Sequence, residues 1–508
     1  MLGSVFIGVD PFRLNTVQDT VRVMTGVNVE GERAIDAPDE PQARRQAVAT
    51  GLGPSVRIVD RPERWTIEER LEHYRCPGVS VAMLRGGEID WVDGFGQRSA
   101  TEPGPCGPDT VYMVASCSKP VTAMLVLQQV ERGILDLDRD VNDYLRRWRV
   151  PLDEFTAASP VTLRRALSHT AGLTVNGWGI VPADSPVPTE LDLLEGRPPS
   201  QFPAVRVDKH HDGTDRYSGG GYLIAQMLLE DVLGVSFAEL AHERVFEPLG
   251  MTRTSFARPW PPDLRDDGAA GHGDDGVAHA PGSLVSAEFG AGGLHSTAAD
   301  YARFLLAVRA AWRGEPGAIL GQEWARLAAT RVERGAFGLG FRVIGEGRSR
   351  RLNHGGSNEG YQTETNLYLE SGDGGVVFTN ATSGLFLFRE VFRALAEVGD
   401  WPEFGPPPKR LAQLSPDELE RYAGDYRIVS GIEVPLIRTW VDDGRLLSEI
   451  PGLRFGVSEM LVDVDGVLFN PGVPFETHVR FGADGRVVGL EVFENGTSVL
   501  AAERLPRA

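Results

Sequence analysis

The hydrophobic period of this chain changes at a proline-rich stretch, residues 401–409, and this change limits the fold more than any other feature. Apolar residues recur largely at helical spacing before it and at a period of two after it. The later segment contains four turn dipeptides, Asp443-Gly444, Asp465-Gly466, Asp484-Gly485 and Asn495-Gly496. Such dipeptides adopt the positive φ that tight hairpins need. Residues 411–508 are therefore predicted to form a small antiparallel β-barrel or meander, after a stiff linker at 401–410.

The part before the linker has a mixed α and β pattern. Apolar segments at 79–84 and 89–92 flank Arg85-Gly86-Gly87-Glu88, which predicts a β-hairpin. Further strands are expected within 338–380, interrupted at 353–360, with helices between the two strand regions. Residues 61–400 are predicted to form one α+β domain. Residues 1–60 are rich in Arg, Asp, Glu and Pro, and are expected to be an N-terminal extension.

Ser116 and Lys119 stand at the start of an apolar helical pattern. Lysine occurs only at 119, 209 and 409, although the 508 residues include 51 Lys and Arg. Unlike arginine, a desolvated lysine can give up its proton and act as a base. Residues three apart share one helix face, and the free N–H groups at a helix start favour developing negative charge. Catalysis is therefore one interpretation, and an N-cap serine followed by a solvated lysine is the other.

Composition excludes several kinds of partner and cofactor. A formal net charge of −20 disfavours nucleic acid and anionic membranes as partners. No apolar run reaches the length of a membrane-spanning helix, and the first residues lack a basic n-region, so a cytoplasmic protein is expected. No histidine or cysteine pattern predicts a metal site, and no cofactor is expected. Cys117, beside Ser116, is interpreted as a small buried residue.

Three motifs together resemble the class C β-lactamase and D-alanyl-D-alanine carboxypeptidase clan of serine hydrolases. They are Ser116-x-x-Lys119, Tyr217-Ser218-Gly219 and His354-Gly355-Gly356, supported by residues 167–173 (LSHTAGL), 247–251 (EPLGM) and 292–294 (GGL). The resemblance covers about residues 65–400. It implies an antiparallel sheet flanked by helices, an all-helical subdomain and a cleft between them. An added C-terminal lipocalin-like domain also occurs in related enzymes.

The resemblance implies roles for individual residues. Ser116 would be the acylated nucleophile, Lys119 and Tyr217 would transfer protons, and His354 would either orient the substrate or be structural. The backbone N–H groups of Ser116 and Ser357 would form the oxyanion hole. Substrate would also contact four residues near these motifs, Gly219, Gly355, Gly356 and Asn358.

Two departures from the family pattern affect the expected substrate. Gly219 stands where the family has asparagine, and glycine cannot provide that residue's hydrogen bonds. The His354-Gly355-Gly356 segment replaces Lys-Thr-Gly, which removes a cation that would pair with a substrate carboxylate. Both departures favour esters, amides or peptides over β-lactams.

Three functions are compatible with these motifs. The first is a hydrolase acting on small esters, amides or D-residue-containing peptides. The second is a penicillin-binding-protein-type thioesterase that transfers the acyl group to an amine, and the third is a non-catalytic binding protein on the same scaffold. The C-terminal domain could cap the cleft, support a homo-oligomer or bind a hydrophobic ligand.

Overall fold

The computed structural model describes residues 39–59, 61–102, 104–430, 436–451, 457–473, 475–494 and 497–506. Most of the expected N-terminal extension, up to residue 38, and the Asn495-Gly496 dipeptide lie outside the described residues. The chain divides into two compact units, Met1–Thr50 with Thr66–Pro402 and Gly51–Trp65 with Glu403–Ala508. The short segment Gly51–Trp65 thus belongs to the second unit, although in the sequence it lies between two parts of the first unit.

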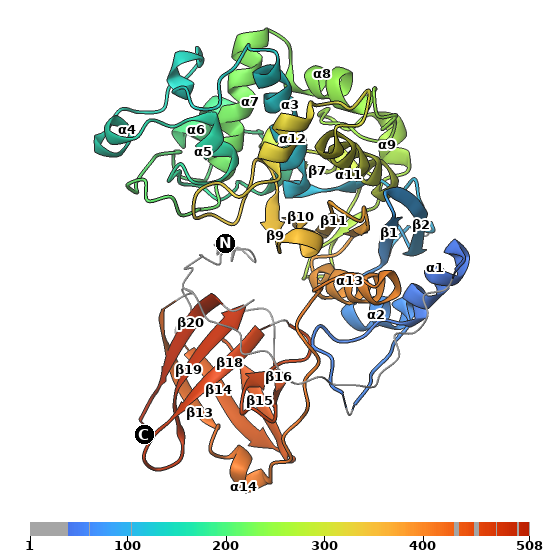
Figure 1. The fold of residues 1–508 in the computed structure, drawn as a ribbon, viewed down its shortest axis with the longest axis vertical. Helices are drawn as coiled ribbons and strands as arrows, with labels where there is room; N and C mark the ends of the chain where they lie inside the picture. Colours follow the sequence, from blue (N-terminus) through green and yellow to red (C-terminus); the bar gives the residue numbers. More distant parts are fainter. Residues whose placement is uncertain are drawn as a thin grey trace. The chain divides into compact units, whose positions relative to one another are not determined.

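A six-stranded antiparallel sheet forms the centre of the first unit, in the order β2-β1-β12-β11-β10-β9 (Figure 1). The predicted hairpin is confirmed as β1 and β2, and β1 pairs with β12, so segments from both ends of the unit share one sheet. The strands are β1 (Gly78–Arg85), β2 (Glu88–Gly96), β9 (Arg342–Ile344), β10 (Arg351–Asn358), β11 (Tyr361–Tyr368) and β12 (Gly374–Thr379).

The predicted interruption at 353–360 is wrong, because residues 353–358 continue β10 and only the following two residues form the turn. Gly355 and Gly356 therefore lie within a strand. A Cβ at Gly356 would overlap the Val114 carbonyl oxygen and Thr363 Oγ1. Glycine is needed here because another backbone approaches closely, which is a common reason for glycine inside a strand.

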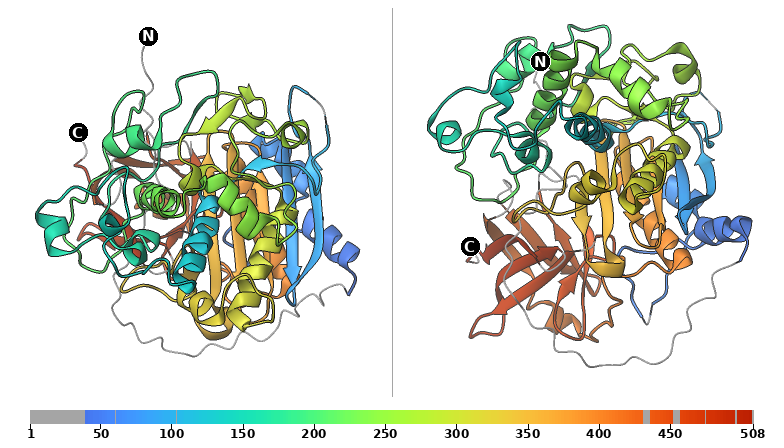
Figure 2. Two further views of the ribbon diagram at one scale, coloured as in Figure 1. Left: turned by 90° about the horizontal axis from the view of Figure 1, so that it is seen from above. Right: turned by 45° about the horizontal axis from the view of Figure 1, so that its top comes forward.

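Helices cover both faces of the sheet (Figure 2). On one face α13 contacts β11 and β12 and is itself contacted by α1 and α2, while α11 contacts β1 and β12 on the other face. Thr297 caps the start of α11, since its Oγ1 accepts a hydrogen bond from the Asp300 N–H at 3.1 Å. These helices are α1 (Pro41–Thr50), α2 (Ile67–Tyr74), α11 (Ala298–Arg313) and α13 (Gly384–Gly399).

A helical subdomain surrounds α3 and α7. Nearly every residue of these two helices is buried, as expected for helices that are apolar on all sides. The subdomain and its connections contain the helices α3 (Ser118–Glu131), α4 (Glu154–Ala158), α5 (Leu163–Leu167), α6 (Glu190–Glu195), α7 (Gly219–Leu233), α8 (Phe237–Ala241), α9 (Pro262–Asp266), α10 (Phe289–Gly292) and α12 (Gln322–Ala328).

Shorter elements connect the sheet with this subdomain. Three pairs of short strands are β3 (Tyr112–Met113) with β8 (His295–Ser296), β4 (Ile180–Pro182) with β7 (Leu284–Ser286), and β5 (Gly271–His272) with β6 (Ala278–His279). Single turns of 3₁₀-helix are η1 (Ala115–Cys117), η2 (Val141–Asp143) and η4 (Gly347–Ser349), and η3 (His242–Phe246) is a π-helical turn.

The second unit contains a closed antiparallel barrel, which confirms the predicted all-β domain. The described Asp-Gly dipeptides form three of its turns, and at the first of them Asp443 and Gly444 both have positive φ, 48° and 73°. The barrel strands are β13 (Gly424–Ser430), β14 (Leu436–Asp442), β15 (Arg445–Glu449), β16 (Ser458–Val462), β17 (Leu468–Phe469), β18 (Phe475–Phe481), β19 (Val487–Glu494) and β20 (Thr497–Arg504), and α14 (Pro416–Leu419) precedes them.

A buried lysine links the start of the second unit to the barrel strands. Lys409 Nζ lies 2.7 Å from Asp463 Oδ2 and 2.8 Å from Glu476 Oε1. The end of the proline-rich segment is thus held by an ion pair network in which the buried lysine has two carboxylate partners.

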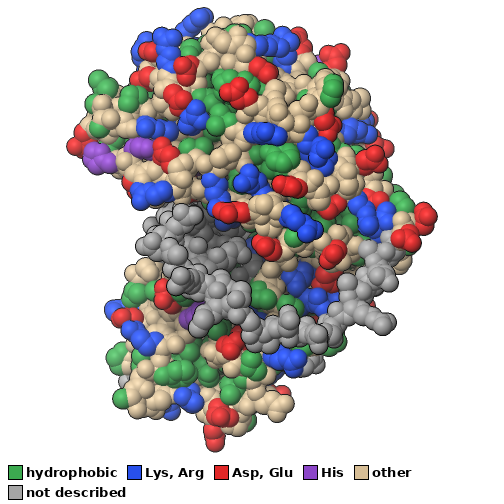
Figure 3. All heavy atoms as spheres, viewed as in Figure 1, with side chains coloured by type: hydrophobic (Ala, Val, Ile, Leu, Met, Phe, Trp, Pro, Cys, Tyr) green, Lys and Arg blue, Asp and Glu red, His purple; other side chains and the backbone are tan. Residues whose placement is uncertain are grey.

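The surface carries charge of both signs. Acidic and basic side chains alternate over the face shown in Figure 3, without a large area of one sign. Within the described residues, no helix is both long enough and apolar enough to cross a membrane.

Candidate active site

Ser116 and Lys119 meet at the start of α3. Lys119 Nζ lies 2.9 Å from Ser116 Oγ and donates a second hydrogen bond, of 2.8 Å, to the Ala291 carbonyl. Lys119 is 1% exposed. A buried lysine in contact with a serine hydroxyl is the arrangement that activates a serine nucleophile, and it differs from a solvated surface lysine.

Ser116 belongs to the 3₁₀ turn η1, and α3 begins two residues later at Ser118. Pro120 lies in the first turn of α3, where its missing N–H costs no helical hydrogen bond. The spacing prediction nevertheless holds, because η1 leads directly into α3 and keeps both side chains on one side.

The turn that presents Ser116 is fixed from several directions. Ala115 has a φ of 46°, a left-handed conformation that costs a non-glycine residue about 1 kcal/mol or more. Ser118 Oγ donates to the Ala115 carbonyl at 2.6 Å and accepts from the Leu294 N–H at 2.9 Å. Tyr301 Oη donates to the Cys117 carbonyl at 2.9 Å. Buried contacts on both sides therefore hold a strained backbone in place.

Tyr217 lies near Lys119, two residues before α7. Lys119 Nζ lies 4.9 Å from the centre of the Tyr217 ring and 5.6 Å from that of Tyr222. The Tyr217 ring also packs against His169, with 4.3 Å between ring centres. The structure thus brings Ser116, Lys119 and Tyr217 together, as the motif order predicts.

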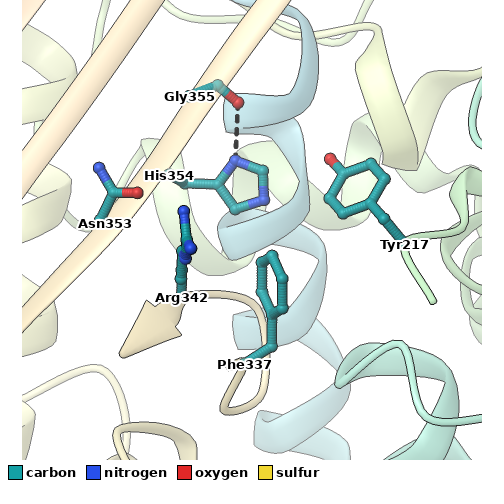
Figure 4. A pocket seen from close by; sticks show the side chains of 6 residues that line it. All are labelled: Tyr217, Phe337, Arg342, Asn353, His354 and Gly355. Carbon is teal, nitrogen blue, oxygen red and sulfur yellow. Dashed lines mark hydrogen bonds between the residues drawn. The ribbon is translucent and has the colours of Figure 1, made fainter. Parts of the chain in front are cut away.

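His354 faces Tyr217 across a small pocket (Figure 4). Its Nδ1 lies 2.8 Å from the Gly355 carbonyl oxygen, which can only accept, so Nδ1 carries the proton. Burial, and then the Lys119 charge, lower the pKa of His354 to about 3. The ring is neutral at ordinary pH, and its buried Nε2 has a free lone pair with no hydrogen-bond partner among the described residues.

The pocket beside His354 is lined by residues from separate parts of the chain. Figure 4 shows the Tyr217 and Phe337 rings on one side of His354 and Asn353 with Arg342 on the other. Gly355 completes the lining. The pocket therefore combines two aromatic rings with one cationic side chain, Arg342.

β10 passes alongside the turn that carries Ser116. The missing Cβ of Gly356 faces Val114 and Ala115, so the backbone of Ser357 follows directly beside η1. Ser357 is exposed, and its Oγ accepts from Gln362 Nε2 at 2.9 Å. Asn358 Nδ2 has no hydrogen-bond partner among the described residues. The donor role of the Ser116 and Ser357 N–H groups and the substrate contacts of Gly355, Gly356 and Asn358 stay predictions.

Cys117 is fully buried and faces the sheet. Its Sγ lies 3.7 Å from the His354 carbonyl oxygen and 3.5 Å from Thr363 Oγ1. Burial raises the pKa of the Cys117 thiol to about 12, so the thiol stays neutral. A neutral, inaccessible thiol is a packing group and not a competing nucleophile.

His169 is a site residue to which the sequence analysis assigned no role. Its backbone has a φ of 65°, and its Nδ1 accepts from the Ser218 N–H at 3.1 Å, so the proton sits on Nε2. Its ring packs against Tyr217 and, edge-on at 4.8 Å, against Phe337. Burial lowers its pKa well below the ordinary value. The sequence feature that could have identified His169 is the segment at residues 167–173, which supported only the family resemblance.

Phe337, Arg342 and Glu288 were also missed. Arg342 begins β9, and Phe337 forms an isolated β-bridge with it, but nothing in the sequence distinguishes either residue. Glu288 precedes α10, whose Ala291 carbonyl accepts from Lys119. Its carboxylate lies beside Gly219, the position that departs from the family motif. Within the described residues, no cluster of three or more His, Cys, Asp or Glu side chains could hold a metal ion.

The chain is similar to penicillin-binding proteins in sequence. It is 25% identical over 415 residues to penicillin-binding protein 4* of Bacillus subtilis (strain 168), covering 76% of this chain and 87% of that protein. This match supports the resemblance to penicillin-binding proteins over most of the length of both chains.

Two solved structures share the fold. The octameric penicillin-binding protein homologue from Pyrococcus abyssi matches with a TM-score of 0.58 and 20% identity, over 86% of this chain and 98% of that one. The D-amino acid amidase from Ochrobactrum anthropi SV3 matches with a TM-score of 0.53 and 22% identity, over 66% of this chain and 95% of that one. At these identities the likeness concerns the fold alone.

The family model for beta-lactamase matches residues 64–400. This range contains the sheet, the helical subdomain and the Ser116, Lys119, Tyr217 and His354 motifs, and it is more than half of the chain. The resemblance stated from those motifs is therefore confirmed, and this protein belongs to the beta-lactamase family.

Proposed function

We propose that this protein is a serine hydrolase that forms an acyl-enzyme on Ser116, with esters, amides or D-residue-containing peptides as substrates. The observation that carries the proposal is the 2.9 Å contact between Lys119 Nζ and Ser116 Oγ in a buried site. Membership of the beta-lactamase family supports hydrolase chemistry in general.

The first step is attack by Ser116 Oγ on the substrate carbonyl carbon. With Lys119 neutral, the Ser116 hydroxyl donates across the 2.9 Å contact, and its proton passes to Nζ as the new C–O bond forms. The carbonyl oxygen becomes an oxyanion, which the Ser116 and Ser357 N–H groups stabilise. Collapse of this intermediate breaks the bond to the leaving group.

Tyr217 completes proton transfer. Its ring lies close to Lys119 Nζ, so the proton taken from Ser116 passes through this pair to the leaving alkoxide or amine. Water then attacks the acyl-enzyme, loses a proton to the same groups and releases the acid with Ser116 restored. With an amine as acceptor, the same step would form an amide.

A D-amino acid amidase with the same fold supports a D-configured amide or ester as substrate, and the two departures from the family motifs disfavour a β-lactam. A D-amino acid amidase and penicillin-binding proteins are among the proteins that share this fold or sequence pattern. Neutral His354 provides an acceptor where a lysine would provide a charge, so it suits a substrate N–H. Arg342 supplies a cation on the other side of the pocket.

Intact-protein mass spectrometry tests the proposal. The protein is incubated with a p-nitrophenyl ester, a penicillin, D-phenylalanine amide and a peptidyl thioester, and compared with Ser116→Ala and Lys119→Ala. We expect a covalent acyl adduct or turnover in the wild type that both variants lose. Lys209→Ala is the matched control, because Lys209 is a partly exposed lysine paired with Thr214 and Asp212.

Turnover that persists in Ser116→Ala would exclude the mechanism. A wild type that is not acylated by any of the four compounds would favour the non-catalytic binding protein. Product analysis with the peptidyl thioester separates hydrolysis from transfer, since a thioesterase of the cyclising kind yields mainly macrocycle.

We also propose that the chain forms a homo-oligomer. A homologue with the same fold is octameric, and that likeness supports the proposal. Size-exclusion chromatography with light scattering measures the mass directly. A mass of 55.2 kDa at micromolar concentration would contradict it.

A further inference from the structure

Three glycines surround the carboxylate of Glu288. A Cβ at Gly219 would lie 3.0 Å from Glu288 Oε2, and Cβ atoms at Gly177 and Gly292 would lie 3.3 and 2.9 Å from Oε1. Contacts under about 3.4 Å are tighter than ordinary van der Waals distances. The three positions come from different parts of the chain, and each leaves room for the same carboxylate.

The space beside Gly219 is therefore already filled. A side chain at position 219 would meet Glu288 Oε2 and, at 2.8 Å, the Asn176 carbonyl oxygen. The Gly219 N–H donates to the same Asn176 carbonyl, which fixes the backbone there. The asparagine of the Tyr-x-Asn motif could not fit without displacing Glu288. The Glu288 carboxylate therefore occupies the space that the asparagine side chain would take.

Glu288 is largely buried in this structure. The residue is 7% exposed, and its Oε2 has no hydrogen-bond partner among the described residues. The Trp178 backbone N–H donates to the carboxyl group. An ionised carboxylate without a full set of partners is costly to bury, and this suggests a function beyond packing.

Lys119 is the charged group that acts on this carboxylate. When Lys119 carries its proton, its ammonium interacts electrostatically with Glu288. Lys119 Nζ also donates to the carbonyl of Ala291, three residues along the chain. Two further charges lie near α10. Arg258 donates to the Ser286 carbonyl, and its guanidinium lies over the Phe289 ring. Glu190 accepts a hydrogen bond from the side chain of Gln226, whose Oε1 in turn accepts from the Gly290 N–H.

We infer that Glu288 is a positioning residue for the acylation reaction, whose buried carboxylate takes the place of the missing side chain at position 219 and stabilises Lys119 as it receives the Ser116 proton. The inference rests on the proposed function of Ser116 and Lys119. The carboxylate acts through Lys119 and does not touch the substrate.

The proton balance is simple. The Ser116 hydroxyl proton moves to Lys119 Nζ, and the charge of an ionised Glu288 attracts the resulting ammonium, which lowers the energy of that state. The proton then leaves Lys119 through Tyr217 to the leaving group, and Glu288 is ionised before and after. When Glu288 is protonated, the ammonium loses this stabilisation and acylation slows.

If Glu288 must be ionised for acylation, the activity should depend on pH in a way that identifies this residue. Burial raises the pKa of Glu288 to about 7, with the Lys119 charge opposing the rise. The two site histidines cannot cause a decline at that pH, because burial lowers the pKa of His354 to about 3 and places that of His169 well below its ordinary value. Activity that requires an ionised Glu288 therefore falls as pH decreases through about 7.

The test is the pH profile of kcat/KM for hydrolysis of p-nitrophenyl acetate, compared between wild type, Glu288→Gln and Glu288→Asp. We expect an acid limb near pH 7 in the wild type and in Glu288→Asp. In Glu288→Gln the limb should no longer lie near pH 7, and kcat should be lower on the order of 10- to 100-fold, because a neutral amide cannot stabilise the ammonium.

Glu364→Gln is the matched control. Burial also raises the pKa of Glu364 to about 7, but its partners are Asn353 and nearby arginines. This variant should keep the limb, and circular dichroism verifies that all variants fold. An unchanged profile in Glu288→Gln, or a limb lost in Glu364→Gln, would overturn the inference. Failure of the proposed function would be recognised by a different result, namely that mass spectrometry shows no acyl adduct on Ser116 of the wild type.

Discussion

The hydroxyl of Tyr301, on α11, donates a 2.9 Å hydrogen bond to the carbonyl of Cys117, the residue that follows Ser116. Both groups are buried. A helix that packs on the sheet is thereby joined directly to the turn that presents the nucleophile. That turn contains Ala115 with a positive φ, so it depends on such contacts to keep its conformation.

Tyr301→Phe tests this connection. The substitution removes one hydroxyl and leaves the Cys117 carbonyl without its partner, which costs about 1–2 kcal/mol of unfolding free energy. We expect lower stability in chemical denaturation and a lower kcat, with KM little changed because no substrate contact is removed. A variant with reduced stability and unchanged kcat would show that the bond supports the fold but not the position of Ser116.

Gly356→Ala tests the close approach of β10 to the nucleophile turn. The added methyl would overlap the Val114 carbonyl and Thr363 Oγ1, neither of which can move freely in the packed core. Overpacking of this kind costs about 1–3 kcal/mol, and the shift of β10 should also reduce acylation. Gly107→Ala is the control, since a Cβ there would meet nothing within 4 Å. Equal stability of the two variants would contradict this explanation of Gly356.

Local patterns predicted the elements well. The hairpin of β1 and β2 followed from two apolar runs around Gly86-Gly87, and the barrel followed from the period of two and the Asp-Gly turns. Both signals come from residues close in sequence. The error at 353–360 arose because Gly355 and Gly356 resemble a turn. Glycine at 356 is instead explained by the close approach of the Val114 carbonyl, which lies far away in the sequence.

The candidate site shows the same limit. Ser116 and Lys119 are three residues apart, so helical spacing sufficed to place them together. Glu288 could not be predicted, because its position depends on glycines at 177, 219 and 292 that meet only in the folded chain. Gly219 was recognised as a departure from the motif, but the group that occupies its space lies 69 positions later by residue number.

Lys119→Arg separates charge from basicity. Arginine keeps a positive charge and can still donate to the Ala291 carbonyl, but it does not lose its proton at accessible pH. If Lys119 is the base, we expect acylation by p-nitrophenyl acetate to fall by roughly 10²- to 10⁴-fold, the usual contribution of a positioned acid or base. Burst kinetics measure this rate. Retention of more than about a tenth of the wild-type rate would mean that Lys119 acts by charge alone.

Glu364→Gln tests how a second carboxyl of raised pKa affects stability. Glu364 lies on β11 and accepts a hydrogen bond from Asn353, and its pKa is raised to about 7 from an ordinary value of 4.5. Between these pH values the folded protein holds a proton that the unfolded chain has lost. Stability therefore decreases as pH rises from about 4.5 to about 7.

The substitution by glutamine removes this penalty and keeps an acceptor for Asn353. Because Glu364 retains some exposure, we expect the variant to gain about 1–2 kcal/mol of unfolding free energy at pH 8 and little at pH 4. Urea denaturation at the two pH values measures the difference. An equal effect at both would mean that the change acts through packing, since ionisation of Glu364 can contribute only above its unfolded pKa.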